Sequence, residues 1–130
     1  DVVFFTFALL NHIPQRKNRV ALLKKAHSLL ASGGHVVLHC DEFPVSQGFR
    51  YHVASQLLRL RWWNKKTWEP GDTVRAFLGT HVDESKPLFF HYYINHYELK
   101  TELTEANLLG WQSGRGWIAQ SIGNEYVPLD

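Results

Sequence analysis

Apolar residues in the first 40 positions fall into runs that predict a strand, a helix and a second strand. The run from Val2 to Leu10 is rich in β-branched and aromatic residues, which is typical of strands buried on both faces inside a parallel sheet. A helix is expected over residues 15–31, because its apolar side chains share one half of a helical wheel. His35 to Cys40 is the expected second strand. Together these elements form a βαβ crossover, whose two strands run parallel.

Turn residues separate these elements. Residues 11–14, Asn-His-Ile-Pro, supply a capping side chain and a proline suited to the start of a helix. Gly33 and Gly34 end the helix, because glycine readily takes the left-handed conformation.

The second half of the chain predicts a less regular segment followed by a helix and a hairpin. A helix over 47–63 and a strand over 74–78 are expected, then an extended segment over 88–94. Asn95 with Glu98 makes an asparagine variant of the capping box, and Leu99, Leu103 and Ala106 form the inner stripe of a helix that ends at Gly110 and Trp111. Strands over 117–122 and 125–127, joined at residues 123–124, are expected to form a hairpin.

Because a central strand needs a neighbour on each side, a chain that opens with one is expected to be the later part of a larger domain. Its 130 residues suit a single domain, residues 1–130.

Composition narrows the class of protein. Hydrophobic residues at 45% and aromatics at 14% suffice for a core, and no apolar run approaches the roughly 18–20 residues that span a bilayer. The net charge is only +2, which does not suggest a general nucleic-acid binder. A single cysteine, Cys40, excludes an intramolecular disulfide framework and fits a reducing compartment, so a cytoplasmic location is expected.

Three stretches, in order, resemble class I S-adenosylmethionine-dependent methyltransferases. Residues 1–14, from the initial aspartate through the apolar strand to Leu10-Asn11-His12, are similar to the fourth strand of that family and the turn after it. Residues 22–40, with Leu-Leu-Ala-Ser-Gly-Gly-His-Val-Val-Leu, are similar to its passage into the fifth strand. Residues 91–111 are similar to a late aromatic segment and helix ending in a glycine-aromatic pair.

The resemblance implies an α/β, Rossmann-like methyltransferase fold of three layers, in which parallel strands are followed by a C-terminal antiparallel hairpin and interrupted by a partly helical insertion. It also implies S-adenosylmethionine as cofactor, and it places residues 43–90 where many relatives carry a substrate-recognition insertion. The aromatic residues of this insertion could line a pocket for a small-molecule methyl acceptor, or they could form a small core under a long loop. The family's glycine-rich loop is absent, since all nine glycines lie at or after Gly33. The chain is therefore expected to hold only the carboxyl-terminal half of the domain, and to bind the cofactor weakly or not at all.

By the same resemblance, the end of the first strand borders the transferred methyl group. Thr6, Phe7, Ala8 and Asn11 are the expected cofactor-binding residues. His12 is the candidate catalytic base, because imidazole exchanges a proton near neutral pH; capping of the following helix is the alternative role. Tyr51, Trp62 and His91 are the expected substrate-binding residues.

Other functions are weighed against methyl transfer. His35, His39, His91 and His96 could be imagined as a metal site, but their spacing lacks the pattern of zinc ligands and no metal is expected. Residues 59–68 interleave cations with tryptophans and carry the alternative of RNA binding. A non-catalytic α/β assembly or binding module is the second alternative, in which the exposed edge of the first strand pairs with another copy.

Overall fold

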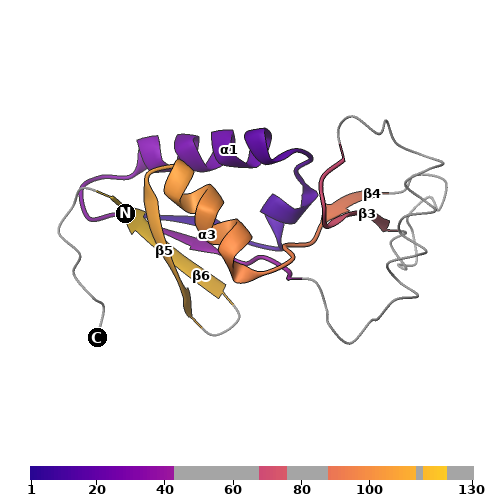
Figure 1. Cartoon of the computed structure of the whole chain (residues 1–130). Coiled ribbons are helices and arrows are strands. Elements are labelled where there is room, and N and C mark those ends of the chain that lie inside the picture. Colours follow the sequence, from indigo (N-terminus) through magenta and orange to yellow (C-terminus); the bar gives the residue numbers. More distant parts are fainter. Residues whose placement is uncertain (43–67, 76–87, 114–115, 123–130) are drawn as a thin grey trace.

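The structure is a computed structural model and describes residues 1–42, 68–75, 88–113 and 116–122. A four-stranded sheet has the order β1-β2-β6-β5, and β3 with β4 forms a separate two-stranded sheet (Figure 1). None of the described helices is long and apolar enough to cross a membrane. The elements in chain order are β1 (Val2–Phe5), η1 (Leu9–His12), α1 (Arg16–Leu29), β2 (His35–Leu38), β3 (Asp72–Arg75), β4 (Leu88–His91), α3 (His96–Glu105), β5 (Leu108–Ser113) and β6 (Gly116–Ser121).

The predicted βαβ crossover is confirmed. β1 and β2 run parallel, with Val2 opposite His35 and Phe5 opposite Leu38, and α1 connects them. The prediction that β1 is buried on both faces is wrong for this chain, because Val2 is 49% and Phe4 64% exposed. The cause is that Val2 and Phe4 point to the face of the sheet that carries no helix among the described residues.

The predicted strand over 117–122 is confirmed as β6, and it forms a carboxyl-terminal hairpin with β5, which precedes it. β5 and β6 pair antiparallel, from Leu108 opposite Ser121 to Ser113 opposite Gly116, and β6 also pairs antiparallel with β2. The predicted helix end at residues 110–111 is wrong. α3 ends at Glu105, Asn107 takes a left-handed φ of 60°, and Gly110 lies inside β5, where it packs closely on Leu103. The predicted strand over 125–127 lies outside the described residues.

α3 begins as predicted. The Asn95 side chain accepts hydrogen bonds from the backbone N–H groups of Tyr97 and Glu98, at 3.0 and 3.2 Å. The Glu98 carboxylate accepts the Ile94 N–H at 2.9 Å, one residue earlier than a standard capping box requires. The apolar stripe of α3 is confirmed, since Leu99, Leu103 and Ala106 are all buried.

Both helices cover the same face of the four-stranded sheet (Figure 1). Because paired residues in a sheet point to the same side, Val36, Ala119 and Gly110 share this face. They meet apolar side chains of α1 and α3 in one core. Its main members are Phe5, Leu23, Ala26, Val36, Leu38, Leu99, Leu103, Leu108, Trp117 and Ala119.

The opposite face of the sheet carries no helix among the described residues. The cross-strand pairs place two rows on it, and neither row contains Asp, Glu, Lys or Arg. The rows are Val2, His35, Gln120 and Leu109, and Phe4, Val37, Ile118 and Trp111. We call these eight residues the open face. The described part of the chain therefore supplies two of the three layers that the sequence predicts.

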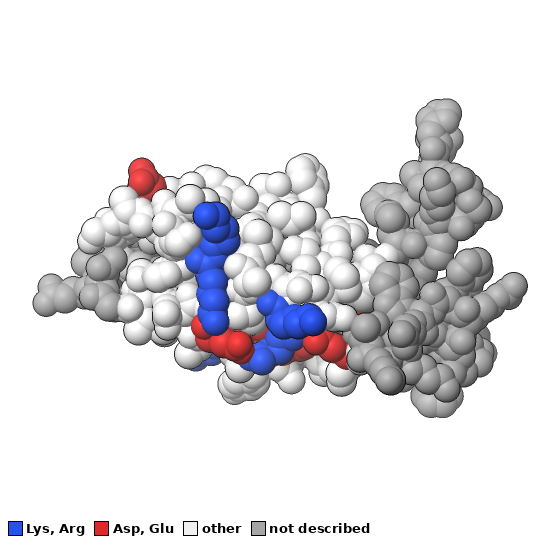
Figure 2. Space-filling view, turned by 90° about the horizontal axis from the view of Figure 1, so that it is seen from above, with Lys and Arg blue, Asp and Glu red and all other residues white. Residues whose placement is uncertain are grey.

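The helix layer differs from the open face in its charge. Viewed from above, Lys and Arg atoms lie beside Asp and Glu atoms on this side of the molecule (Figure 2). One such contact is the exposed ion pair between Arg16 and Glu105, at 2.6 Å, which links the start of α1 to the end of α3.

Candidate functional site

The carboxyl ends of β1 and β2 form the candidate site, because open α/β sheets bind ligands at this edge. After β1, Phe7 and Ala8 both take φ values of 53°, which are left-handed and uncommon for residues other than glycine. Thr6 and Phe7 are exposed, Phe7 to 90%, whereas Ala8 is buried. Backbone strain of this kind is concentrated at functional sites, and here it holds an exposed turn directly after the strand.

Asn11 fastens this turn to two other segments. Its amide nitrogen donates hydrogen bonds to the carbonyl oxygens of Asp41 and His91, at 2.8 and 2.7 Å, and its amide oxygen accepts the Asp41 N–H at 3.1 Å. The side chain is completely buried. Its hydrogen bonds thus join η1, the end of β2 and the end of β4.

His12 stays at the surface beside β4. Its Nδ1 lies 3.3 Å from the carbonyl oxygen of Phe89, and its ring meets the Phe90 ring edge-on at 5.0 Å between centroids. Because a carbonyl oxygen only accepts, Nδ1 carries the proton in this contact. In the neutral ring, Nε2 is then the free acceptor, as a base requires.

The sequence predicts that residues 11–14 cap the N-terminus of α1, but this prediction is wrong. Gln15 occupies the cap position with a left-handed φ of 67° and no capping side chain. Instead, the carboxylate of Glu69 accepts the Arg16 N–H, with distances of 2.7 and 2.9 Å to its two oxygens. The cap therefore comes from 53 residues away in the sequence, which removes helix capping as the role of His12.

Behind this edge lies a buried polar cluster that the sequence analysis missed. Arg19 and Glu102 are fully buried, and the guanidinium contacts the carboxylate at 2.7 Å. Arg19 also binds Glu69 at 3.0 Å, and the Tyr93 hydroxyl donates to Glu102 at 2.9 Å. Burial acts to lower the pKa of Arg19, but the hydrogen bond and charge of Glu102 raise it overall. Burial and the Glu102 charge raise the pKa of Tyr93, so both groups keep their protons.

His91 occupies the centre of a second part of this cluster. Its Nδ1 lies 2.7 Å from Asp72 and its Nε2 lies 3.1 Å from Glu98. Burial alone would lower the pKa of His91, but the hydrogen bonds to Asp72 and Glu98 raise it above its usual value. Burial would raise the pKa of Glu98, but the hydrogen bond from His91 lowers it. The ring is therefore held as an imidazolium between two carboxylates.

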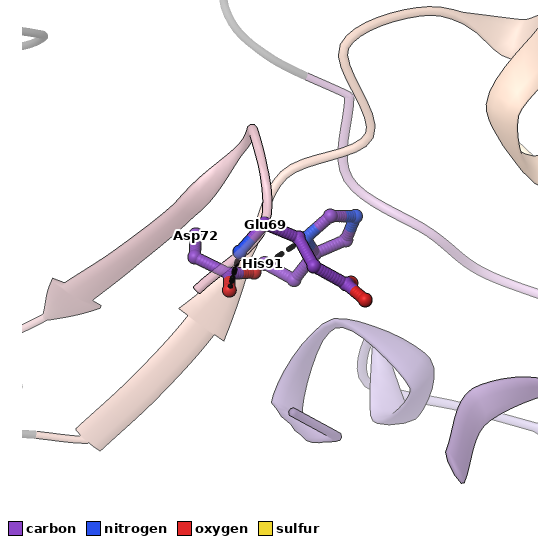
Figure 3. A group of neighbouring side chains, drawn as sticks. All are labelled: Glu69, Asp72 and His91. Atoms are coloured by element: carbon purple, nitrogen blue, oxygen red, sulfur yellow. Dashed lines mark hydrogen bonds and ion pairs between the residues drawn. The ribbon is translucent and has the colours of Figure 1, made fainter. Parts of the chain in front are cut away.

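One group of side chains among the described residues has the ligand types and the spacing to hold a metal ion. It consists of Glu69, Asp72 and His91, whose ligand atoms all lie within 4.8 Å of one another (Figure 3). Each already has protein partners. Asp72 accepts from His91 and from the Glu69 N–H, and Glu69 binds Arg19 and caps α1. These contacts fasten the turn before β3 to the helices. They also give each of the three side chains a partner within the protein, so a metal ion is not needed to explain why they lie together.

The structure brings some of the predicted site residues together. Thr6, Phe7, Ala8, Asn11 and His12 follow β1 in one turn, and the His91 carbonyl touches Asn11. The His91 ring is buried, and both of its nitrogens are bonded to carboxylates. Tyr51 and Trp62, the predicted helix over 47–63 and residues 59–67 of the RNA alternative lie outside the described residues. Trp68, the last residue of that alternative, is buried against Phe89.

A weak sequence signal for the missed cluster exists. Glu102 lies within the 99–103–106 stripe of α3, and Arg19 precedes Leu23 and Ala26 at helical spacing. A charged residue inside the apolar stripe of each of two neighbouring helices is the pattern expected of a buried ion pair, because unpaired buried charges are rare.

No family model and no curated protein matches the sequence. The fold is similar to a crystal structure of a SAM-dependent methyltransferase from Methanosarcina mazei, with a TM-score of 0.58 and 19% sequence identity. The match covers 93% of this chain and 57% of that chain, so the chain spans little more than half the length of the solved structure. The similarity establishes a methyltransferase-like α/β fold.

Proposed function

We propose that this chain is the carboxyl-terminal part of an S-adenosylmethionine-dependent methyltransferase acting on a small-molecule acceptor in the cytoplasm. The observation that carries the proposal is the strained turn at the carboxyl end of β1, where Phe7 and Ala8 take left-handed φ values and Phe7 is exposed, in a fold similar to such an enzyme. This is the edge of an α/β sheet at which ligands bind.

The described residues fit the cofactor in part. Exposed Thr6 and Phe7 offer a polar group and an aromatic face. No glycine precedes Gly33, so the turn after β1 lacks the close backbone approach that a glycine-rich loop gives. Weak binding by this chain alone follows from that partial fit.

S-adenosylmethionine, when bound, supplies an activated methyl group. The residues of this chain would orient the acceptor and receive its proton. His12 has the suitable tautomer, because its Nδ1 proton points to the Phe89 carbonyl and leaves Nε2 as acceptor. Asn11 acts as a positioning residue, because its side-chain amide already donates hydrogen bonds to the backbone of two neighbouring segments. We keep Tyr51 and Trp62 as candidate acceptor contacts. We assign His91 a structural role, because its buried ring joins the end of β4 to Asp72 and Glu98.

Amide chemical shifts of the 130-residue chain during titration with S-adenosylmethionine test this proposal. We expect shifts at residues 6–8 and 12, with a dissociation constant on the order of 1 mM. Gly33 and Gly34, at the opposite end of the parallel strands, serve as internal controls and should not move. Methionine and adenosine, added separately, should shift the same amides less. Absence of shifts at residues 6–8, or equal shifts at the two glycines, contradicts the proposal.

A further inference from the structure

A small buried core lies apart from the main core and joins β4 to the turn after β1. Phe90, in β4, and Tyr92, directly after it, lie two residues apart on the same side of the chain. Their rings meet edge-on, with 4.8 Å between centroids. The side chain of Ala8 completes this core, and all three residues are 5% exposed or less. The core therefore holds the turn whose Phe7 and Ala8 take left-handed φ values.

Phe90 also contacts the ring of His12. The two rings lie 5.0 Å apart between centroids, at 86° to each other, which is a favoured arrangement of aromatic rings. The other contact of the imidazole is the Phe89 carbonyl oxygen, 3.3 Å from Nδ1. Because this hydrogen bond is long, it restrains the ring weakly, and the Phe90 ring supplies the further contact that limits its rotation. One side chain of β4 thus contacts both the turn and the candidate base.

The backbone on both sides of this aromatic pair is fixed. The Tyr92 N–H donates to the Gly71 carbonyl at 2.9 Å. Gly71 has a φ of 93° and lies so close to the Tyr92 carbonyl oxygen that a Cβ at position 71 would collide with it. Between the two aromatic residues, the His91 carbonyl accepts the Asn11 amide at 2.7 Å. Phe90 therefore stands on a rigid support, as the positioning of a site requires.

We propose that Phe90 is a positioning residue of the candidate site, which fixes the left-handed turn after β1 and the ring of His12 relative to each other. Phe90 acts through Ala8 and His12 and is not itself a catalytic residue. A transfer reaction is slowed strongly when its groups are misplaced by about 1 Å, so a rigid contact common to the turn and the base favours the reaction. The contribution to methyl transfer rests on the proposed function, whereas the contacts themselves do not.

Nitrogen-15 NMR of the His12 ring in the 130-residue chain, at a pH where the ring is neutral, tests the contact with the base. The Nδ1–H tautomer should predominate in the unmodified chain, because Nδ1 faces the Phe89 carbonyl. Phe90→Leu keeps an apolar side chain but removes the ring, and should shift the tautomer ratio roughly twofold to tenfold away from Nδ1–H.

Phe89→Leu is the matched control for that variant. Phe89 is the neighbouring buried phenylalanine, but its ring points to the other side of β4 and packs on Trp68. The substitution keeps the backbone carbonyl that faces His12, so the tautomer ratio should stay as it is in the unmodified chain.

Amide hydrogen exchange tests the contact with the turn. The backbone N–H groups of Leu9 and Asn11 donate within this segment, at 3.1 and 2.9 Å. In Phe90→Leu both should exchange roughly twofold to tenfold faster, measured relative to amides in the middle of α1, which report the stability of the whole chain. Ala8→Gly should speed the same exchange but leave the His12 tautomer unchanged, because glycine adopts this φ without strain and only the methyl group is lost.

An unchanged tautomer ratio in Phe90→Leu overturns the positioning role, as does an equal change in Phe89→Leu. Exchange that rises equally in the turn and in α1 also overturns it, because that result describes a general loss of stability. Unchanged exchange in Ala8→Gly would show that the small core does not hold the turn.

The same variants separate this role from the proposed function. With S-adenosylmethionine added, Phe90→Leu should raise the dissociation constant roughly twofold to tenfold, and Phe89→Leu should leave it unchanged. If the unmodified chain shows no shifts at residues 6–8, the proposed function fails. The tautomer ratio and the exchange, both measured without ligand, then still decide whether Phe90 holds the turn and His12 together.

Discussion

The two faces of the four-stranded sheet are built from the same strands but differ in what covers them. On the helix-covered face, Leu108 is completely buried, whereas its neighbour Leu109, on the open face, is 42% exposed. Arg19 and Glu102 are fully buried under the helices, while Phe4 is 64% exposed on the other side. Burial in this chain therefore follows position in the sheet more closely than the hydrophobicity of the residue.

The difference has a physical basis in the connections of the chain. A crossover from β1 to β2 places α1 on one face, and α3 packs beside it above the same strands. The second face receives no helix from the described residues, although parallel strands are normally covered on both sides. The covered face should therefore dominate the free energy of unfolding.

The largest effect is expected from breaking the buried ion pair beneath the helices. Glu102→Ala removes the buried partner of Arg19 and of the Tyr93 hydroxyl, and should lower the free energy of unfolding by roughly 3 kcal/mol, because the buried Arg19 then keeps only the partly exposed Glu69 as a carboxylate partner. Urea denaturation measures this loss. Replacing both partners, with Arg19→Met and Glu102→Leu together, should recover most of the stability.

Glu105→Ala is the control for that variant. It removes the exposed pair with Arg16 on the same two helices, and should cost under about 1 kcal/mol. Equal losses for Glu102→Ala and Glu105→Ala would show that burial of the charges does not determine the effect.

Two neighbouring residues of β5 compare the faces directly. Leu108→Ala should cost about 2–5 kcal/mol, because it leaves a cavity in the helix-covered core. Leu109→Ala, on the open face, should change the free energy of unfolding by under about 1 kcal/mol. Thermal unfolding at a concentration too low for association separates the two. A costly Leu109→Ala would mean that the open face is covered.

The smallest expected effect is a pH dependence that originates in the polar cluster beside α3. The raised pKa of His91 adds stability that is fully present below its usual value of 6.5 and is lost as the pH rises through the folded-state value. The lowered pKa of Glu98 adds stability that is present above its usual 4.5 and is lost as the pH falls through the folded-state value. Stability from this pair is thus greatest between about 4.5 and 6.5.

His91→Gln should flatten the pH profile of urea stability above pH 6.5 by an amount on the order of 1 kcal/mol. His35→Gln is the matched control, because this half-buried ring lies on the open face and its Nε2 has no hydrogen-bond partner among the described residues. If the pH profile changes only in the His35 variant, the pH dependence does not originate in His91, and the prediction fails.

Sequence patterns predicted the local elements well where one face of an element is apolar. The βαβ crossover, the asparagine cap of α3 and the inner stripe of Leu99, Leu103 and Ala106 are all confirmed. The same pattern extended α3 too far, because the apolar pair Leu108 and Leu109 continues the helical spacing. In the structure, Leu108 and Gly110 instead pair with β6, which a local pattern does not reveal.

The candidate site was predicted only as far as it is local. Residues 6–8, 11 and 12 were identified by the resemblance, at the end of a strand predicted to run to Leu10. The structure ends this strand at Phe5 and places these residues in the turn and the 3-10 helix that follow it. The Glu69 cap of α1, the Asn11 bonds to β2 and β4, and the His91 bridge each join residues that are distant in sequence, except for the bond from His91 to Glu98. Such contacts depend on how distant segments pack together, so they cannot be predicted from hydrophobic periodicity.

By itself, the sequence determined the crossover of β1, α1 and β2 with its parallel strands and the start of α3, because backbone periodicity and crossover handedness are local or nearly local properties. Only the tertiary structure decided which sheet face is covered, which charges are buried and what caps α1. Those features depend on long-range packing, in which the free energy of a buried Arg19 or an exposed Phe4 is set by neighbours that lie far away along the chain.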